Sequence, residues 1–334
     1  MFYNPAMALD RDLEVAVAGQ LGRIGRHAHR AWEMTAATGV RGLRYLHEGR
    51  GADRLLATES HPEAFEWLRR NCGLYEREGA EARWADARAG MDEGPFDFVD
   101  LDPYGSPLPF LGAALSACTA SAVLAVTATD LRVLGGADAP TAVVRYGGRP
   151  PRGRLGPEGG LRVLLAAVDR AARAGGRSVT PLLAYVGDHH LRVYVSIGPE
   201  GPDPAPVAPI DPSEWTGPPL AGPEPIGPLW MGPLFDPELV RGLAVPAGAA
   251  HPRELGRLLD VLRGELEVDR PFFYESNEIA ARLGLDRPRP VEEILAALRA
   301  HGFAAARTHA RAGAFRTTAT WAEVASVVQG TAGR

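Results

Sequence analysis

Residues 96–107, with the sequence FDFVDLDPYGSP, place an acid, a proline and an aromatic residue directly after an apolar run. The run at 96–101 predicts a buried strand, which Pro103 ends because proline cannot donate a hydrogen bond to a neighbouring strand. Ligands of open α/β sheets bind just beyond the carboxyl ends of the strands. We therefore expect Asp102, Pro103 and Tyr104 to lie together at the mouth of a pocket.

These three residues suit the methylation of an exocyclic amine on a nucleobase. The lone pair of such an amine is conjugated into the ring, so the nitrogen attacks poorly until acceptors draw its two hydrogens out of the plane. The Asp102 carboxylate and the backbone carbonyl of Asp102 or Pro103 can accept them, and Tyr104 can stack on the base, which is worth about 1–3 kcal/mol. The alternative is an ordinary exit from a strand through a turn-forming Asp-Pro pair.

The segments around this stretch predict strands that alternate with helices. Strands are predicted near 31–36, 53–59, 81–86, 96–101 and 122–127, and helices from 10, 41, 62, 108 and 159. Two further strands, 179–186 and 191–197, flank Gly187-Asp188-His189-His190, which predicts a hairpin. Alternating elements closed by an antiparallel hairpin are typical of the Rossmann-like sheet of class I methyltransferases, an α/β fold.

Three positions at predicted strand ends suggest how a nucleotide-like cofactor is held. The small residues around Gly39 permit close approach of an adenosyl group, or form only a structural turn. Glu59 ends the second strand about 20 residues later, where an acid commonly binds the two ribose hydroxyls. Asp86 and Ala87 follow the third strand, where they can hold an adenine ring, although Asp86 also fits an ordinary surface acid. The full G-x-G-x-x-G motif is missing, which disfavours a dinucleotide.

The first eleven residues carry two aromatic side chains, Phe2 and Tyr3, and an Asn4-Pro5 pair, although chain termini are commonly polar. They are interpreted either as an arm that closes over the pocket or as an apolar anchor on the core.

The amino-acid composition limits the classes of protein to which the chain can belong. The 334 residues are 46% hydrophobic and 23% charged, which is typical of a globular chain. We expect neither a membrane span, for lack of an apolar run of about 18 residues, nor a secretory signal. Two distant cysteines, Cys72 and Cys118, fit a reduced, cytoplasmic compartment. No metal is expected, because the cysteines are too few for a zinc site and His189 and His190 fit turn residues better than ligands.

The basic residues are all arginine, and the net charge is −5. Three stretches, 23–30, 145–154 and 299–316, contain arginines without any carboxylate. The exclusive use of arginine fits a GC-rich genome, whereas the acid-free clusters hint at contacts with phosphates.

A second module follows a linker. Residues 198–228 contain eleven prolines and no periodicity, which predicts an extended segment. Beyond it, helices at 252–267, 276–283 and 290–301 and a hairpin at 303–306 and 315–318 suggest an α+β winged-helix-like domain. Its wing carries basic side chains that either contact phosphates or form a solvated face. These residues are Arg307, His309, Arg311 and Arg316. The predicted domains are 1–198, a linker at 199–228, and 229–334.

Together these segments resemble the tRNA guanine-26 N2-dimethyltransferase family along nearly the whole chain. The likeness rests on ordered motifs in both modules. They are FYNP with DRD at 2–12, ATGVRGLR at 37–44, DLDPYGSP at 100–107, VTATD at 126–130, GPLWMGPL at 227–234 and RTH at 307–309.

The resemblance implies an S-adenosylmethionine-dependent enzyme that transfers one or two methyl groups to the N2 amine of guanosine 26 in tRNA. It implies that Arg11 and Arg41 contact the methionine end of the cofactor. Glu59 would take the ribose, where the family usually has Asp, and Asp86 and Ala87 would hold the adenine. For the substrate, the implied residues are Asp102 and Pro103 as acceptors, Phe2 and Tyr104 as stacking rings, and Asn4, Arg307, His309, Arg311 and Arg316 as tRNA contacts.

Two other functions are kept as alternatives. The same fold with the same acceptors also suits the N6 amine of adenine in DNA or RNA. A non-catalytic tRNA-binding homologue with a decayed site is the second alternative, and it differs from an enzyme in failing to bind S-adenosylmethionine.

Overall fold

The computed structural model describes residues 3–49, 51–76, 79–90, 94–201, 206–268 and 270–330. The chain divides into two compact units. The first comprises Met1–Asp130, Ala167–Pro204 and Leu234–Leu259, and the second comprises Leu131–Ala166, Ala205–Pro233 and Asp260–Arg334.

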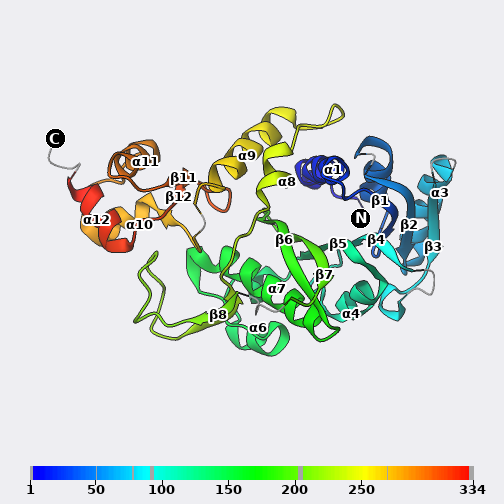
Figure 1. Ribbon diagram of the computed structural model, residues 1–334, viewed down its shortest axis with the longest axis horizontal. Helices are drawn as coiled ribbons and strands as arrows, with labels where there is room; N and C mark the ends of the chain where they lie inside the picture. Colours follow the sequence, from blue (N-terminus) through cyan, green and yellow to red (C-terminus); the bar gives the residue numbers. More distant parts are fainter. Residues whose placement is uncertain are drawn as a thin grey trace. The chain divides into compact units, whose positions relative to one another are not determined.

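A seven-stranded sheet forms the centre of the first unit (Figure 1). Its strands are β1 (Ala28–Glu33), β2 (Ala52–Glu59), β3 (Ala80–Trp84), β4 (Phe96–Leu101), β5 (Cys118–Ala128), β6 (Arg177–Val186) and β7 (Leu191–Pro199). Their order is β3-β2-β1-β4-β5-β7-β6; the pairs from β3 to β5 are parallel, and β7 runs antiparallel to β5 and β6. The predicted class I methyltransferase sheet with its closing hairpin is confirmed.

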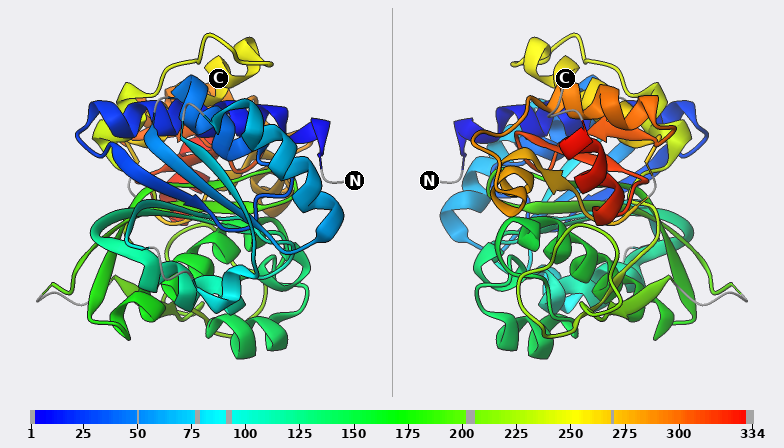
Figure 2. Two further views of the ribbon diagram at one scale, coloured as in Figure 1. Left: turned by 90° about the vertical axis from the view of Figure 1, so that its right-hand side faces the viewer. Right: turned by 90° about the vertical axis from the view of Figure 1, so that its left-hand side faces the viewer.

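Helices flank this sheet. They are α1 (Ala8–Arg23), α2 (Val40–Arg44), α3 (Pro62–Leu74), α4 (Leu108–Ala117) and α8 (Pro237–Gly242), with short helical turns at Pro5–Met7, Tyr45–Gly49 and Ala87–Ala89. Helix α3 shows why the sequence folds this way: Pro62 opens it, and Ala64, Leu68 and Cys72 recur every four residues on its buried face. That face packs on β2 and β3 (Figures 1 and 2).

The middle strands carry the core. Val99 and Leu101 of β4 and Leu124 and Val126 of β5 are fully buried. Parallel strands that are covered on both faces are apolar almost continuously rather than at alternate positions. For this reason the apolar run at 96–101 predicts a buried strand from the sequence alone.

The second unit contains smaller sheets and the remaining helices. Its elements are α5 (Leu131–Leu134), α6 (Ala139–Tyr146), a helical turn at Gly153–Leu155, β8 (Val207–Ile210), β9 (Ile226–Trp230), β10 (Tyr274–Glu275), α10 (Ser276–Leu283), α11 (Val291–Ala300), β11 (Ala305–Arg307), β12 (Ala314–Thr317) and α12 (Trp321–Gly330). Two helices, α7 (Gly156–Arg173) and α9 (Pro252–Glu265), contribute residues to both units.

Residues 274–330, the winged module, confirm the predicted winged-helix-like layout. The order of elements is β10-α10-α11-β11-β12-α12, and the three strands pair as β10-β12-β11. Tyr274 stacks on Phe315 at 5.8 Å and on Trp321 at 6.4 Å between ring centroids. Ile294 and Leu298 of α11 complete this buried core.

The proline-rich segment is partly regular structure. Strand β8 lies within it and pairs antiparallel with β9, with Val207 opposite Trp230. The amide and carbonyl of Gly227 bond to the carbonyl and amide of Arg149, at 2.7 and 2.9 Å. The compact units follow a different division from the predicted domains 1–198, 199–228 and 229–334, which stay a prediction. In the described part of the chain, no helix is long and apolar enough to cross a membrane.

Candidate active site

The turn after β1 joins the carboxyl ends of β1, β2 and β4. The Met34 amide donates to the Asp100 carbonyl at 2.9 Å, and the Ala36 amide donates to the Thr58 carbonyl at 2.9 Å. The Thr35 hydroxyl accepts from the Asp102 amide at 3.2 Å. These bonds bring the predicted cofactor turn, the end of β2 and the Asp-Pro-Tyr stretch together.

Gly39 is required where this turn enters α2. Its φ is +75°, and a Cβ there would lie 2.5 Å from Cδ1 of Leu68 on α3. A side chain would be strained and would collide with the core, so glycine lets the turn lie close to α3. The predicted small-residue turn is thus a closely packed feature of the fold.

Glu59, at the end of β2, is held by backbone amides. Its Oε1 accepts from Ser60 and His61, and its Oε2 accepts from Ala37, all at 2.8 Å. Because each carboxylate oxygen has two lone pairs, Oε2 keeps one acceptor site. The carboxylate is therefore fixed in direction and can still accept from a hydroxyl group.

Asp102 lies at the end of β4 beside a guanidinium group. Its Oδ2 is 2.6 Å from Nη2 of Arg41, and its side chain is 28% exposed. Burial acts to raise the pKa of Asp102, but the charges of Arg41 and Arg192 outweigh it and hold the pKa below its usual value. Asp102 is therefore an ionised acceptor at neutral pH.

Beneath Asp102 lies a buried cluster of charges. Arg41 Nε is 2.9 Å from Glu14 Oε2, and Arg192 approaches Glu14 Oε1 at 3.1 Å and Asp100 Oδ2 at 2.9 Å. The Tyr45 hydroxyl donates to Asp100 Oδ2 at 2.8 Å. Burial raises the pKa of Glu14 against the effect of both arginines, so one of the carboxylates can take up a proton.

Four buried atoms of this cluster lack a hydrogen-bond partner among the described residues: Glu14 Oε1 and Oε2, Asp100 Oδ1 and Arg41 Nη1. Arg41 Nη1 is buried and bonds to no acceptor among the described residues; Asp100 Oδ1 lies 3.7 Å away. A buried guanidinium donor of this kind is costly unless something accepts from it. The arrangement leaves it available to a ligand carboxylate.

The loop after Asp102 presents Tyr104 to solvent. Tyr104 is 91% exposed, whereas Pro103 before it is buried. Gly105 (φ +79°) anchors the loop to the end of β5: its amide donates to the Thr129 hydroxyl at 2.6 Å, and its carbonyl accepts from the Thr129 amide at 2.9 Å. An exposed ring on an anchored loop can receive a flat partner.

Asp86 and Ala87 follow β3 as predicted. The Asp86 carboxylate caps the helical turn at Ala87–Ala89, accepting from the Arg88 amide at 3.0 Å and from the Arg88 guanidinium. The guanidinium lowers the pKa of Asp86 to about 2. Because this ion pair is exposed, it is weak, and a ligand can displace Arg88 at small cost.

The amino-terminal arm meets Arg11. Arg11 Nη2 donates to the Asn4 carbonyl at 3.0 Å, and its guanidinium lies 4.6 Å from the Tyr3 ring centroid. Arg11 itself is buried. Phe2, the predicted stacking partner of Tyr104, lies outside the described residues.

The structure corrects two predicted tRNA contacts in the winged module, Arg316 and His309, whose side chains are buried. Arg316 is buried and bonds to Glu158 Oε2 at 2.9 Å and to Glu265 Oε1 at 2.7 Å, so its guanidinium does not reach the surface. His309 Nδ1 also bonds to Glu265, at 2.5 Å. The sequence places no acid near these residues in the wing, but folding brings acids from distant segments to them.

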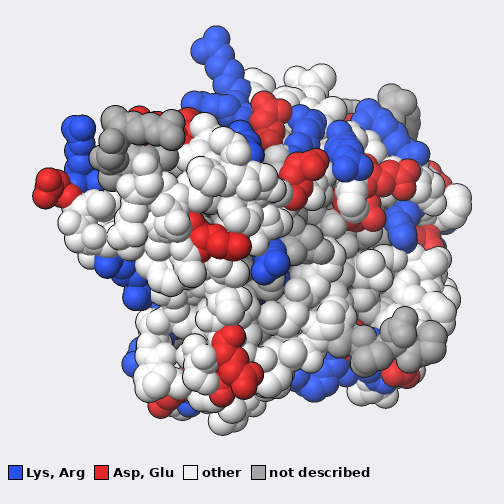
Figure 3. Space-filling view, turned by 60° about the vertical axis from the view of Figure 1, so that its left-hand side comes forward, with Lys and Arg blue, Asp and Glu red and all other residues white. Residues whose placement is uncertain are grey.

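Arg307 and Arg311 remain exposed. Arg307 pairs with Glu292 at 2.5 Å, and Arg311 pairs with Glu275 at 3.1 Å. On the face drawn in Figure 3, arginines and carboxylates are interspersed rather than gathered into one basic field.

The hairpin between β6 and β7 contributes a buried imidazole. His190 is 2% exposed, lies edge-on to Tyr185 with 5.8 Å between centroids, and approaches Asp10 Oδ1 at 3.5 Å. Burial lowers the pKa of His190 to about 4, so the imidazole is neutral at pH 7. His189 and His190 lie in the turn region between these strands, as predicted.

Sequence reasoning missed the buried cluster below the site. Glu14, Asp100 and Arg192 lie in apolar segments, and Arg192 stands inside the run LRVYV, where a charge predicts a buried partner. The sequence thus predicts that Arg192 has a buried acidic partner, but it does not identify which acid this is.

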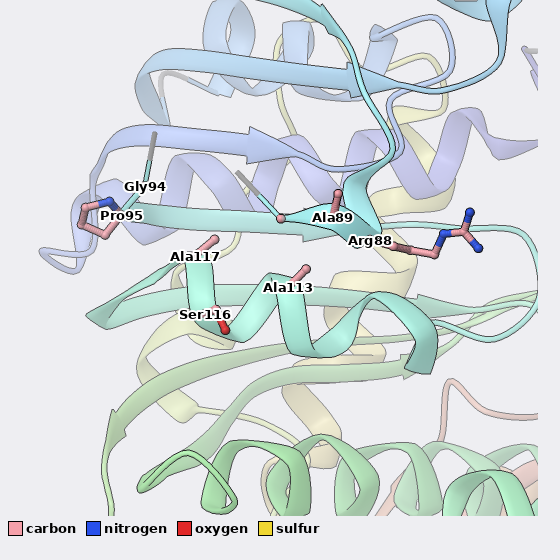
Figure 4. Close-up of a pocket in the computed structure, with 8 residues that line it drawn as sticks. Arg88, Ala89, Gly94, Pro95, Ala113, Ser116 and Ala117 are labelled. Carbon is pink, nitrogen blue, oxygen red and sulfur yellow. The ribbon is translucent and has the colours of Figure 1, made fainter. Parts of the chain in front are cut away.

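A cavity of about 470 Å³ lies beside Arg88, the partner of Asp86. It is lined by Arg88, Ala89, Gly90, Gly94, Pro95, Ala113, Ser116 and Ala117. Figure 4 shows small side chains of α4 along it, with the Arg88 guanidinium directed away from them. The described residues that line it do not include the predicted acceptors Glu59 and Asp102.

Comparisons with known proteins agree with this geometry. The family model described as N2,N2-dimethylguanosine tRNA methyltransferase matches residues 1–202 and 221–329. The chain is 32% identical to the tRNA (guanine(26)-N(2))-dimethyltransferase of Thermococcus kodakarensis over 98% of the chain and 93% of that protein. It is 32% identical to the enzyme of the same name from Methanosarcina acetivorans over 100% of the chain and 92% of that protein.

A solved structure is also similar over almost the whole length. It is Trm1 from Pyrococcus horikoshii in complex with S-adenosyl-L-methionine. The two share 28% sequence identity with a TM-score of 0.82, over 97% of this chain and 94% of the other.

Proposed function

The chain belongs to the N2,N2-dimethylguanosine tRNA methyltransferase family, and on this premise we propose how its residues perform the reaction. The protein is an S-adenosyl-L-methionine-dependent enzyme that methylates the N2 amine of guanosine 26 in tRNA. When bound, the cofactor supplies an electrophilic methyl group carried on a sulfonium.

Three features support cofactor binding at the strand ends. The buried Nη1 of Arg41 lacks an acceptor among the described residues, which fits the carboxylate of a methionyl group. Glu59 Oε2 keeps a lone pair for a ribose hydroxyl, and Gly39 keeps the adjoining turn close to the protein. Asp86 and Ala87 are proposed to hold the adenine, with Arg88 displaced from the carboxylate.

Asp102 is proposed to activate the guanine amine. Its carboxylate accepts one N–H, and the backbone carbonyl of Asp102 or Pro103 accepts the other, which localises the nitrogen lone pair. Tyr104 stacks on the base, and Phe2 is proposed to stack on the other face. The observation that carries this proposal is an ionised carboxylate, fixed 2.6 Å from Arg41, next to a tyrosine that is 91% exposed.

Transfer is proposed to be direct, without a covalent link between enzyme and substrate. The residues contribute position and a preorganised negative charge rather than a nucleophile. The guanine must leave its stack in the tRNA to reach Tyr104. Asn4, Arg307 and Arg311, which are exposed, are proposed to contact the tRNA. His309 is not, because its side chain is 2% exposed and its Nδ1 bonds to Glu265.

The test is mass spectrometry of nucleosides from tRNA incubated with enzyme and S-adenosyl-L-methionine. Wild type is expected to yield N2-methylated guanosine at position 26, and Asp102→Ala is expected to leave it unmodified. Full activity of Asp102→Ala would reject the assigned role.

A control variant shows whether activity depends on the carboxylate at position 102 or on the loss of any carboxylate. Asp260→Ala removes a carboxylate that is 75% exposed on α9 and is expected to keep wild-type activity. Isothermal titration with S-adenosyl-L-methionine should show that Asp102→Ala still binds the cofactor, so the loss lies in the substrate step.

A further inference from the structure

We propose that His27, His29 and Asp53 bind a divalent transition-metal cation, with zinc as the best fit, at the amino ends of β1 and β2. Among the described residues, these three form a group whose ligand atoms all lie within 4.8 Å of one another. The site is distinct from the carboxyl ends of the strands, where the methyl transfer is assigned.

The Asp53 carboxylate already bridges the two imidazoles. Its Oδ1 lies 2.7 Å from Nε2 of His27, and its Oδ2 lies 2.7 Å from Nδ1 of His29. The two rings meet edge to face with 5.8 Å between centroids. Each histidine thus directs one ring nitrogen toward the Asp53 carboxylate.

The backbone preorganises this arrangement. His29 lies in β1 and His27 immediately precedes the strand, and both imidazoles reach Asp53 of β2. Strands β1 and β2 run in parallel register with Ala28 opposite Ala52, so Asp53 follows on the neighbouring strand beside His29. The Asp97 carboxylate accepts from the amide of His29 at 3.0 Å, which fixes the strand backbone there.

The donor set and its spacing suit zinc. Two imidazole nitrogens and a carboxylate oxygen are common ligands of zinc, and imidazole disfavours magnesium and calcium. Tetrahedral ligands about 2.0–2.1 Å from zinc are separated by roughly 3.3 Å, a value between the 2.7 Å of the present carboxylate–imidazole contacts and the 4.8 Å that bounds the group, so side-chain shifts of at most about 1.5 Å complete the site. A water molecule completes four-coordination.

The site is reachable and its side chains can move. His29 is 81% exposed, Asp53 54% and His27 36%. A cation can therefore enter without unfolding the sheet. Once bound, it links the beginning of β1 to β2 and stabilises the sheet, because the unfolded chain does not hold the three ligands together.

Two binding measurements test the site, using the full chain freed of metal with a chelator. Titration with zinc chloride is expected to show one ion per chain in the micromolar range or tighter. His29→Ala and Asp53→Ala should each weaken binding at least about tenfold. His301→Ala removes an exposed imidazole after α11 and should bind zinc like wild type.

The visible spectrum of bound cobalt reports the coordination geometry of the metal, and adventitious binding at the surface would not give a four-coordinate spectrum. Wild type with cobalt chloride is expected to show the intense visible absorption of a four-coordinate ion, and His29→Ala should show the weak absorption of a hydrated ion. Saturating zinc should raise the wild-type Tm by about 4 °C and leave the Tm of His29→Ala unchanged. Equal zinc affinity in wild type and both site variants, or a weak cobalt spectrum in wild type, would overturn the proposal.

Discussion

The Arg41 guanidinium reaches the Asp102 carboxylate, with 2.6 Å between Nη2 and Oδ2, and the same guanidinium contacts Glu14. Burial alone would favour the neutral acid at position 102, and the arginine charges reverse that preference. The charge on the proposed acceptor therefore depends on Arg41.

Replacing Arg41 is expected to move the pH dependence of catalysis. In Arg41→Gln, burial persists without the main opposing charge, so the pKa of Asp102 rises. Because ionised Asp102 is the active form, the acidic limb of the kcat profile should shift to higher pH. The profile is measured at saturating cofactor, since Arg41 also contributes to the proposed cofactor site.

Arg69→Gln is the control for this experiment. Arg69 is exposed on α3 and pairs with Glu66. Its profile should coincide with wild type, and an unshifted acidic limb in Arg41→Gln would contradict the dependence of Asp102 on Arg41.

Removing the ring of Tyr104 should weaken the use of tRNA as substrate and leave the stability of the fold unchanged. Stacking of a base on an aromatic ring is worth about 1–3 kcal/mol, so Tyr104→Ala should lower kcat/KM for tRNA by roughly 5- to 150-fold. Tyr104→Phe keeps the ring and should stay near wild type. Because the side chain is 91% exposed, the Tm of both variants should match wild type. Equal kcat/KM in the alanine and phenylalanine variants would count against stacking.

Glu33 should make stability fall as pH rises. Burial, reinforced by Asp100, raises its pKa from 4.5 to about 8. The stabilising neutral form is complete below pH 4.5 and is lost as pH rises through 8, at up to about 1.4 kcal/mol per pH unit. Glu33→Gln keeps an oxygen that can accept from the Gly42 amide and carries no charge.

The measurement is urea unfolding of both proteins from pH 5 to pH 9. The free energy of unfolding of Glu33→Gln should gain on that of wild type from pH 5 to about 8, and the difference should level off above that pH. Glu66→Gln, at an exposed position, should run parallel to wild type. Parallel curves for Glu33→Gln would show that Glu33 does not carry this dependence.

Arg316 should be a stability residue rather than a tRNA contact. Arg316→Met leaves Glu158 and Glu265 buried without their shared guanidinium, a change that typically costs about 3–5 kcal/mol. Arg307→Met, at an exposed position in the same module, should cost less than about 1 kcal/mol. Urea unfolding compares the two, and equal stability of both variants would contradict the buried network.

The sequence predicted the sheet because its central strands are apolar runs that end in turn residues. Residues 96–101 and the strands around Gly187 are of this kind, and the structure confirms them. Short helices such as α5 and α8 were not predicted, because four to six residues are too few to show a helical periodicity. Strand β8 was not predicted, because the proline-rich sequence around it favours an extended linker, although an edge strand tolerates its one proline, Pro209.

The candidate site was predictable where a residue stands at a strand end. Asp102 and Glu59 follow strands, and the sheet brings them to one edge. Contacts between distant segments were not predictable: the acids that neutralise Arg316 lie in α7 and α9. The His27-x-His29 pair is visible in the sequence, but its third partner, Asp53, becomes a neighbour only through the register of β1 and β2.

Strand β7 lies between β5 and β6 and brings Arg192 to Tyr45, 147 residues earlier in the chain. Until the ribosome has made β7, β5 has an open edge, and Glu14 and Asp100 lack one of their two arginines. The nascent chain therefore passes through a stage at which its longest strand can pair with the wrong partner. Translation that pauses before β7 should leave the chain dependent on chaperones until the sheet closes.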